Sequence, residues 1–237
     1  MTRTIVISDL HGSTALLDAI LEHASFSSDD RLVVAGDMID VGTQDVVSAV
    51  RDLGATVLVG NHEVAAAIGL RISPQNPESL ARGSEFADNV LSGRWTLATV
   101  VDDWLVTHAG VSVTLEDVIT RCDRDPVRIA EALNALFREE VERALAESPL
   151  TPAGLDGFRL LGGEMGPLWF RPFDLSRIPS GIRQIVGHTP PELLAKEQLS
   201  ALEAHGWRLV EPGHRAGHNG TVRYAVVENG LARVIEG

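Results

Sequence analysis

The sequence predicts an α/β fold built on a parallel sheet, and two observations carry that prediction. In the first 60 residues, short apolar β-branched runs alternate with amphipathic segments, which is the βαβαβ pattern of a parallel sheet covered on both faces. Each of the three runs leads directly into a polar block containing Asp, Asn or His next to Gly. Because the carboxyl ends of parallel strands meet at one edge, we expect these side chains to share one crevice.

The first five elements follow from apolar periodicity and helix-capping residues. Ser13 and Thr43 are the expected N-caps of the two helices. In chain order, the predicted elements are a strand at 5–7, a helix at 13–23, a strand at 32–35, a helix at 43–53 and a strand at 56–59.

The rest of the chain predicts further strands around a long helix. Asp102-Asp103 is a hairpin turn, Asp125 caps the long helix with Pro126 at its first position, and Asn229-Gly230 turns the last hairpin. The expected elements are helices at 64–70, 84–90 (within a polar loop, 73–93) and 127–146, and strands at 96–101, 104–107, 183–186, 221–227 and 231–235. We expect one domain, residues 1–237, with a helical cap insertion at about 111–179.

Composition limits the partners of the protein. A net charge of −13 argues against nucleic acid, whose binders carry basic surfaces. It leaves room for a small phosphate ester, because bound cations reverse the charge within a site.

With Cys122 as the only cysteine, neither a disulfide framework nor a cysteine zinc site is expected. Neither a signal peptide nor a membrane-length apolar run is visible, so a cytoplasmic location without a membrane partner is the expectation. The oligomeric state is not indicated by any pattern.

Five short blocks carry the candidate chemistry. They are Asp9-Leu10-His11, Gly36-Asp37-Met38-Ile39-Asp40, Gly60-Asn61-His62-Glu63, His108-Ala109-Gly110 and Gly187-His188-Thr189-Pro190. Taken singly, such residues often only cap or form turns. Taken together they offer nitrogen and oxygen ligands without thiolate, which suits Mn, Fe or Zn better than a Ca²⁺ cage. A carboxylate can bridge two cations, and a pair of cations can drive displacement at phosphorus.

The order of these blocks resembles the calcineurin-like metallophosphoesterases. Within that family it is most similar to the phosphoprotein-phosphatase branch, whose bacterial members include protein phosphatases and diadenosine tetraphosphatase-like enzymes. The resemblance implies a four-layer α/β/β/α sandwich and a site with two divalent metal ions. One ion would be held by Asp9, His11 and Asp37, and the other by Asp37, Asn61, His108 and His188, with Asp37 bridging.

The resemblance also implies the roles of the remaining block residues. A hydroxide between the metals would attack phosphorus, and His62, oriented by Asp40, would protonate the leaving group. Manganese is the expected metal in vitro. A His62–Asp40 pair that only supports the site is the alternative.

The chain departs from the family pattern where substrate phosphate is usually bound. Val41 stands where the protein-phosphatase pattern has a phosphate-clamping Arg, and Val64 stands where another Arg is common. Arg171 is our candidate replacement clamp, since a guanidinium binds phosphate oxygens in pairs; a structural residue of a cap hinge is its alternative role. Asn61 is the second candidate substrate-binding residue.

These observations predict a metal-dependent phosphoesterase acting on a phosphomonoester, either a phosphoprotein or a small molecule. A diadenosine polyphosphate hydrolase is the alternative, favoured if a second basic subsite exists. A non-catalytic module that binds phosphorylated ligands is the third possibility. His214 and His218, which flank Arg215 in a Gly-rich loop, are either further ligands or part of a solvated loop.

Overall fold

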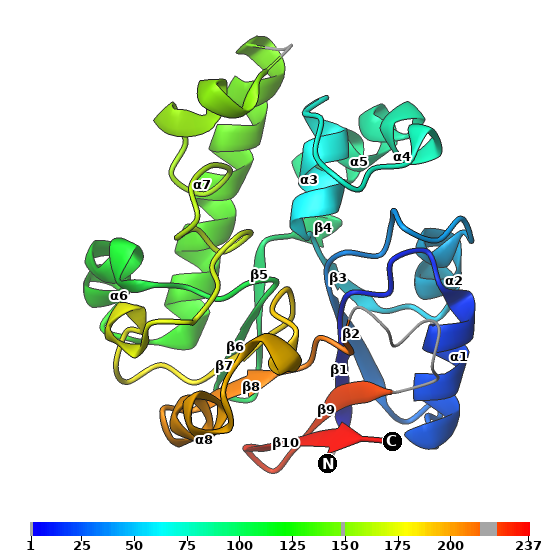
Figure 1. Cartoon of the computed structure of the whole chain (residues 1–237), viewed down its shortest axis with the longest axis vertical. Coiled ribbons are helices and arrows are strands. Elements are labelled where there is room, and N and C mark those ends of the chain that lie inside the picture. Colours follow the sequence, from blue (N-terminus) through cyan, green and yellow to red (C-terminus); the bar gives the residue numbers. More distant parts are fainter. Residues whose placement is uncertain (1, 148–149, 214–221) are drawn as a thin grey trace.

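Two β-sheets packed face to face form the core of the computed structural model, which describes residues 2–147, 150–213 and 222–237 (Figure 1). The first sheet has the order β10-β9-β1-β2-β3-β4 and the second has the order β5-β6-β7-β8. Strands β1 to β3 are parallel, as predicted, β4 pairs with β3 in the same sense, and β9 pairs with β1 in the antiparallel sense. The strands are β1 (Thr4–Ile7), β2 (Arg31–Ala35), β3 (Thr56–Leu58), β4 (Trp95–Thr96), β5 (Ala98–Val101), β6 (Trp104–Thr107), β7 (Gln184–Val186), β8 (Trp207–Leu209), β9 (Arg223–Glu228) and β10 (Leu231–Glu236).

Alternating side chains of the buried strands face different layers. Val6 packs between the two sheets, whereas Ile5 and Ile7 pack toward the helices. The same alternation holds in β6, where Val106 faces the opposite sheet and Leu105 faces the helical layer. Successive strand side chains point to opposite faces, so a strand buried on both faces is apolar throughout. This is why the runs look continuous in the sequence.

Helices cover the outer face of each sheet and complete the sandwich. In Figure 1, α1 (Thr14–His23) and α2 (Val46–Asp52) lie outside the first sheet, and α6 (Glu116–Arg121), α7 (Pro126–Glu147) and α8 (Lys196–Ala204) lie beside the second. Helix α7 packs on β5 and β6, and α8 packs on β8. The α/β/β/α sandwich fold is therefore confirmed. Short helices α3 (Asn61–Ala67), α4 (Pro77–Ala81) and α5 (Gly83–Leu91) follow β3.

Two predicted helix starts were wrong. Helix α2 begins after Asp45, whose carboxylate accepts the N–H of Ser48, and not at Thr43. Residues 42–44 are held against the first block instead, since Gln44 accepts the N–H of Thr14. Helix α3 begins at Asn61, three residues earlier than expected.

The predicted strand at 96–101 is divided between the two sheets. Its first residue pairs with β3 and its last four pair with β6. At the crossing, the side-chain oxygen of Asn134 on α7 accepts the N–H groups of Leu97 and Ala98. Both backbone donors are thus satisfied where the chain leaves one ladder for the other.

Four elements were not predicted, namely α4, α6, α8 and β8. Between β6 and β7 the described residues form helices only: α6, α7 and the single-turn helices η1 (Val113–Leu115), η2 (Pro152–Gly157) and η3 (Leu175–Arg177). The cap limits at 111 and 179, and the single domain, stay predictions. Residues 214–221, with the candidates His214, Arg215 and His218, lie outside the described residues. Among the helices of the described ranges, none has both the length and the apolar character that crossing a membrane requires.

Candidate active site

The first ligand block is a tight turn at the end of β1. Asp9 and His11 both have left-handed backbone angles, with φ of 54° and 44°. The N–H of Asp9 donates to the carbonyl of Gly36 (3.0 Å), and that of His11 donates to the carbonyl of Asp37 (2.9 Å). These bonds fix the turn after β1 against the turn after β2, so the two blocks present their side chains together.

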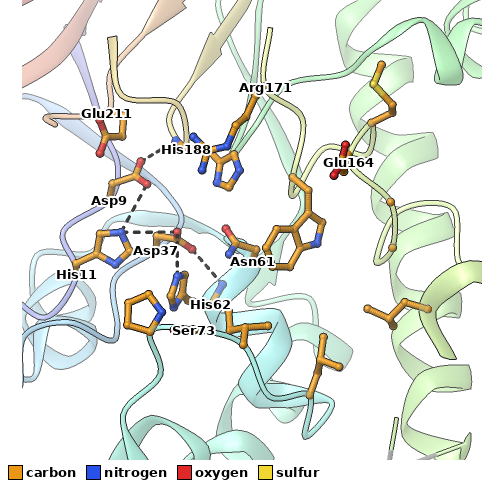
Figure 2. A pocket seen from close by; sticks show the side chains of 18 of the residues that line it. Asp9, His11, Asp37, Asn61, His62, Ser73, Glu164, Arg171, His188 and Glu211 are labelled. Carbon is orange, nitrogen blue, oxygen red and sulfur yellow. Dashed lines mark hydrogen bonds and ion pairs between the residues drawn. The ribbon is translucent and has the colours of Figure 1, made fainter. Parts of the chain in front are cut away.

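Asp37 lies at the centre of the cluster, as Figure 2 shows, and is only 2% exposed. Its Oδ2 lies 3.9 Å from His11 Nε2, 3.4 Å from His108 Nε2 and 4.0 Å from His62 Nε2. Its Oδ1 accepts the N–H of His62 (3.1 Å). One carboxylate therefore faces side chains from both sheets.

Asn61, His108 and His188 form the other half of the cluster. Asn61 starts α3 after β3, His108 follows β6, and His188 follows β7. His108 Nε2 lies 3.0 Å from Asn61 Oδ1 and 3.2 Å from His188 Nδ1. Each of the three residues is at most 8% exposed, so the structure brings together six candidate ligands from five strand ends.

Glycines in two blocks allow this close approach. A Cβ at Gly60 would lie 2.0 Å from Asp37 Oδ1, and one at Gly187 would lie 2.2 Å from Asp9 Oδ2. The backbone N–H of His188 donates to the same Asp9 oxygen (3.0 Å). Any side chain at either glycine would displace a carboxylate, which explains why Gly adjoins the ligands.

The hydrogen bonds of two histidines show that the cluster fits a cation. His108 Nδ1 lies 2.8 Å from the carbonyl of Ala35, and His11 Nδ1 lies 3.1 Å from that of Ile39. A carbonyl can only accept, so each Nδ1 carries a proton, and in the neutral form of each ring the lone pair of Nε2 points toward Asp37. Metal-binding histidines commonly donate their other N–H to a carbonyl. Unprotonated donor atoms facing one another call for a positive ion between them.

The pKa values of the cluster's histidines also indicate a site for a cation. Burial lowers the pKa of His108, but the Asp37 carboxylate outweighs it and raises that pKa to about 10. Burial and the neighbouring His108 together hold the pKa of His188 well below its ordinary value. The cluster thus attracts positive charge beside Asp37 but repels a second proton on the neighbouring imidazole. Three-residue groups able to hold a metal are His11, Asp37 and His62, and Asp37, His108 and His188.

His62 and Asp40 form a separate pair at the edge of the cluster. His62 Nδ1 lies 2.6 Å from Asp40 Oδ2, and the other oxygen of Asp40 accepts the N–H of Asn76 (2.8 Å). Burial opposes protonation of His62, yet the carboxylates of Asp37 and Asp40 raise its pKa to about 9. With Nδ1 held by Asp40, Nε2 faces the pocket.

Arg171 lines the same pocket as the cluster and lies beside His188 (Figure 2). Its Nη1 is buried and has no hydrogen-bond partner among the described residues. A buried guanidinium N–H without an acceptor is costly, so this donor is available to an anionic ligand. The structure therefore places Arg171 in the same pocket as the candidate ligands, and its role as the phosphate clamp stays a prediction.

Sequence reasoning missed two buried carboxylates. Glu63 is 1% exposed and accepts backbone N–H bonds from Asp37 (2.9 Å), Met38 (2.7 Å), Ile39 (3.3 Å) and Gly60 (2.8 Å). Glu211, 2% exposed, lines the pocket, and burial followed by the charge of Asp9 raises its pKa to about 8. Glu211 follows β8 just as Asp9 follows β1; the apolar pair Leu209-Val210 before it was the signal.

A sandwich whose strand ends gather carboxylates, imidazoles and an amide is the architecture of a metal-dependent hydrolase. The chain belongs to the calcineurin-like phosphoesterase family, whose profile matches residues 2–215. The family resemblance seen in the motif order is thereby confirmed, and the chain is a divalent-metal-dependent phosphoesterase.

Solved structures share this fold at low sequence identity. A cold-active protein-tyrosine phosphatase of a psychrophilic Shewanella species has a TM-score of 0.65 at 20% identity, with all of this chain and 78% of that chain covered. A "putative diadenosine tetraphosphatase" has a TM-score of 0.52 at 18% identity, with all of this chain and 94% of that chain covered. No curated protein matches the sequence significantly.

Proposed function

We propose that the protein is a two-metal phosphomonoesterase. Asp9, His11 and Asp37 would hold one divalent cation, and Asp37, Asn61, His108 and His188 would hold the other. The observation that carries this assignment is the position of Asp37, which has His11 on one side at 3.9 Å and His108 on another at 3.4 Å. A carboxylate so placed can serve two cations at once.

The cations, Mn in vitro and Mn, Fe or Zn in the cell, would supply the Lewis acidity that activates water and offsets phosphate charge. His62 donates a proton to the leaving oxygen through Nε2, while Asp40 fixes the ring through Nδ1. Arg171 binds phosphate oxygens with its free N–H, and Asn61 adds an amide beside them. Together these groups place an ester phosphorus between the cluster and His62.

A phosphomonoester, on a small molecule or a phosphoprotein, is the substrate class that the pocket favours. Arg171 is the only Lys or Arg among the described lining residues, and a dinucleoside polyphosphate carries several anionic groups. The dinucleoside polyphosphate alternative rests on the resemblance in motif order and on the name of one structural neighbour. A non-catalytic binding module would have no use for the short bond between His62 and Asp40. A cytoplasmic location stays a prediction.

Metal depletion and reconstitution test the proposal. After chelation and removal of the chelator, the protein should not hydrolyse p-nitrophenyl phosphate, and Mn²⁺ should restore the rate. Asp37→Asn should lose bound metal, measured by elemental analysis, together with activity. Equal rates before and after exhaustive chelation, or full metal and activity in Asp37→Asn, would refute the two-metal assignment.

A further inference from the structure

The pocket above the ligand cluster is far larger than a phosphate group. Its volume is about 710 Å³, within the range of sites that enclose a drug-sized molecule. Asp9, Asp37 and His188 occupy one end of it. The remaining surface must therefore select the group to which the phosphate is attached.

Apolar side chains from the loops after β2 and α3 line one part of this surface. They are Val41, Leu70, Ile72 and Pro74. Val41 is 58% exposed and has a left-handed backbone angle, φ 61°, which is a costly conformation for a β-branched residue. A ligand that covers this exposed side chain would remove apolar surface from water, which is favourable.

The segment after α7 lines the opposite part with larger apolar groups. They are Leu155, Met165, Trp169 and Phe173. The Trp169 ring meets the His188 ring edge to face, with centroids 6.2 Å apart, so the aromatic surface begins at the ligand cluster itself. Phe173 is 46% exposed. A flat ring joined to a phosphate at the cluster would lie against Trp169, and Phe173 extends the apolar lining of the pocket.

The charges at the mouth of the pocket are negative. Asp156 and Glu164 are exposed lining residues, and neither has an ion-pair partner among the residues that the structure describes. Glu164 lies on the side of the pocket away from Asp9 and His11 (Figure 2). Beyond the cluster, Arg171 is the sole Lys or Arg among the described lining residues, and its place beside His188 commits it to the phosphate.

We infer from these apolar and acidic lining residues that the substrate is an aryl phosphate whose other groups are neutral or positively charged. This inference rests on the phosphomonoesterase function proposed above. The ring lies between Val41 and Trp169, with the phosphate at the cluster. A positively charged substituent reaches Asp156 and Glu164 at the mouth. Additional phosphates or carboxylates on the substrate meet these acids and are rejected.

Non-hydrolysable phosphonates test the apolar walls without the influence of leaving-group reactivity. With the Mn-loaded enzyme, benzylphosphonate should inhibit at least roughly tenfold more tightly than methylphosphonate, because the ring is removed from water. Val41→Asn should reduce the ratio of the two inhibition constants. Its thermal stability should equal or exceed that of the wild type, since Asn accepts the left-handed angle. Val127→Asn, at an exposed valine on α7, is the control and should keep the ratio. Equal inhibition by the two phosphonates would overturn the aryl assignment.

Two aryl phosphates of opposite side-chain charge test the mouth. The phosphate esters of tyramine and of 4-hydroxyphenylacetate share a phenol leaving group, and kcat/KM should favour the tyramine ester by roughly threefold or more. Replacing both acids, Asp156→Asn with Glu164→Gln, should remove the preference. The matched control, Asp88→Asn with Glu139→Gln at exposed positions outside the pocket, should keep it.

The outcomes separate this inference from the proposed function. Hydrolysis of phenyl phosphate without preference for the tyramine ester, or with a preference that survives in the pocket variant, overturns the charge assignment alone. If the Mn-loaded protein hydrolyses no ester, the proposed function fails. Calorimetric binding of benzylphosphonate and methylphosphonate then decides whether the apolar walls bind an aryl group.

Discussion

Two buried carboxylates beside the cluster, Glu63 and Asp40, have different roles, and neither is a proposed ligand. Glu63 accepts four backbone N–H groups from the loops after β2 and β3, so it fixes the backbone that carries Asp37 and Asn61. Asp40 accepts from the side chain of His62 and from the N–H of Asn76, so it fixes the imidazole ring of His62. Removing the first should alter the fold of the site, and removing the second should alter its proton transfer.

Glu63→Gln should destabilise the protein and weaken its hold on metal. The amide keeps one oxygen acceptor but turns an NH₂ group toward N–H donors, and each unsatisfied buried donor costs about 1–3 kcal/mol. We expect a loss of about 2–4 kcal/mol in the free energy of unfolding, measured by urea denaturation. Glu22→Gln on the exposed face of α1 is the control. Wild-type stability in Glu63→Gln would show that the loops are held by other contacts.

His62→Asn should keep bound metal but lose turnover, because a general acid contributes about 10²–10⁴-fold. The loss should be larger for phenyl phosphate than for p-nitrophenyl phosphate, whose leaving group needs no proton. Steady-state kinetics with a series of aryl phosphates measures this slope. A loss of the same size for every leaving group would exclude His62 as the acid and leave it a ligand or a support.

At the scale of elements, helix α7 determines where two loops run. Its Asn134 accepts N–H bonds at the point where the chain crosses from the first sheet to the second. Less than two turns further along the helix, its Glu140 is 6% exposed and accepts the N–H groups of Arg159, Leu160 and Leu161. The segment just beyond Leu161 carries Glu164 and the aromatic wall of the pocket.

Glu140→Gln should therefore loosen the wall of the pocket without touching the ligand cluster. At least one of three backbone donors loses its acceptor, which we expect to cost about 1–3 kcal/mol. Amide hydrogen exchange should become faster at residues 159–165 and stay unchanged in β1 and β2. The neighbouring exposed substitution Glu139→Gln is the control, and unchanged exchange at 159–165 would contradict the anchoring role.

The elements that sequence predicted are those whose cause is local. Apolar runs gave β1 to β3, Ser13 capped α1 as expected, and Asp125 accepts the N–H of Val127 at the start of α7. The elements missed have non-local causes. The division of 96–101 follows from a helix 37 residues away, and β8 has only three residues, which pair with β7.

The residues of the candidate site divide in the same way, into those that local sequence predicts and those that only distant contacts explain. Ligand types at strand ends could be predicted because strand and turn are adjacent in the chain. Their supports could not, since Glu63 bonds to residues up to 26 positions away and Glu211 follows the missed strand. The chain separates Arg171 from Val41 by far more, and only the fold shows that both line one pocket.

At the scale of the whole molecule, the proposed metal ligands come from both sheets. Asp9, His11, Asp37 and Asn61 follow strands of the first sheet, whereas His108 and His188 follow strands of the second. The interface between the sheets is otherwise apolar, with Val6 and Ile185 among its members. A cation bound at the cluster would thus add a link between two layers that hydrophobic packing and hydrogen bonds such as that of His108 to Ala35 hold together.

This linkage makes metal binding a contribution to global stability. A ligand that binds only the folded state at 100 times its Kd adds about 2.7 kcal/mol, and in a chain of this length each kcal/mol raises Tm by about 2–4 °C. We therefore expect saturating Mn²⁺ to raise the Tm of the metal-free protein by about 5–10 °C, measured by calorimetry. Amide hydrogen exchange should become slower in strands of both sheets when Mn²⁺ is bound.

The net charge of −13 offers a competing cause, because any divalent cation screens repulsion on an acidic surface. Asp37→Asn separates the two. This substitution removes one charge from the centre of the cluster and leaves the surface acids in place. A rise in Tm that comes from screening of the surface would therefore be nearly unchanged in the variant. A site-specific effect would be lost, since the carboxylate between the two halves of the cluster is gone. A rise in Tm of the same size in Asp37→Asn and in the wild type would mean that the cation acts on the surface and does not join the sheets.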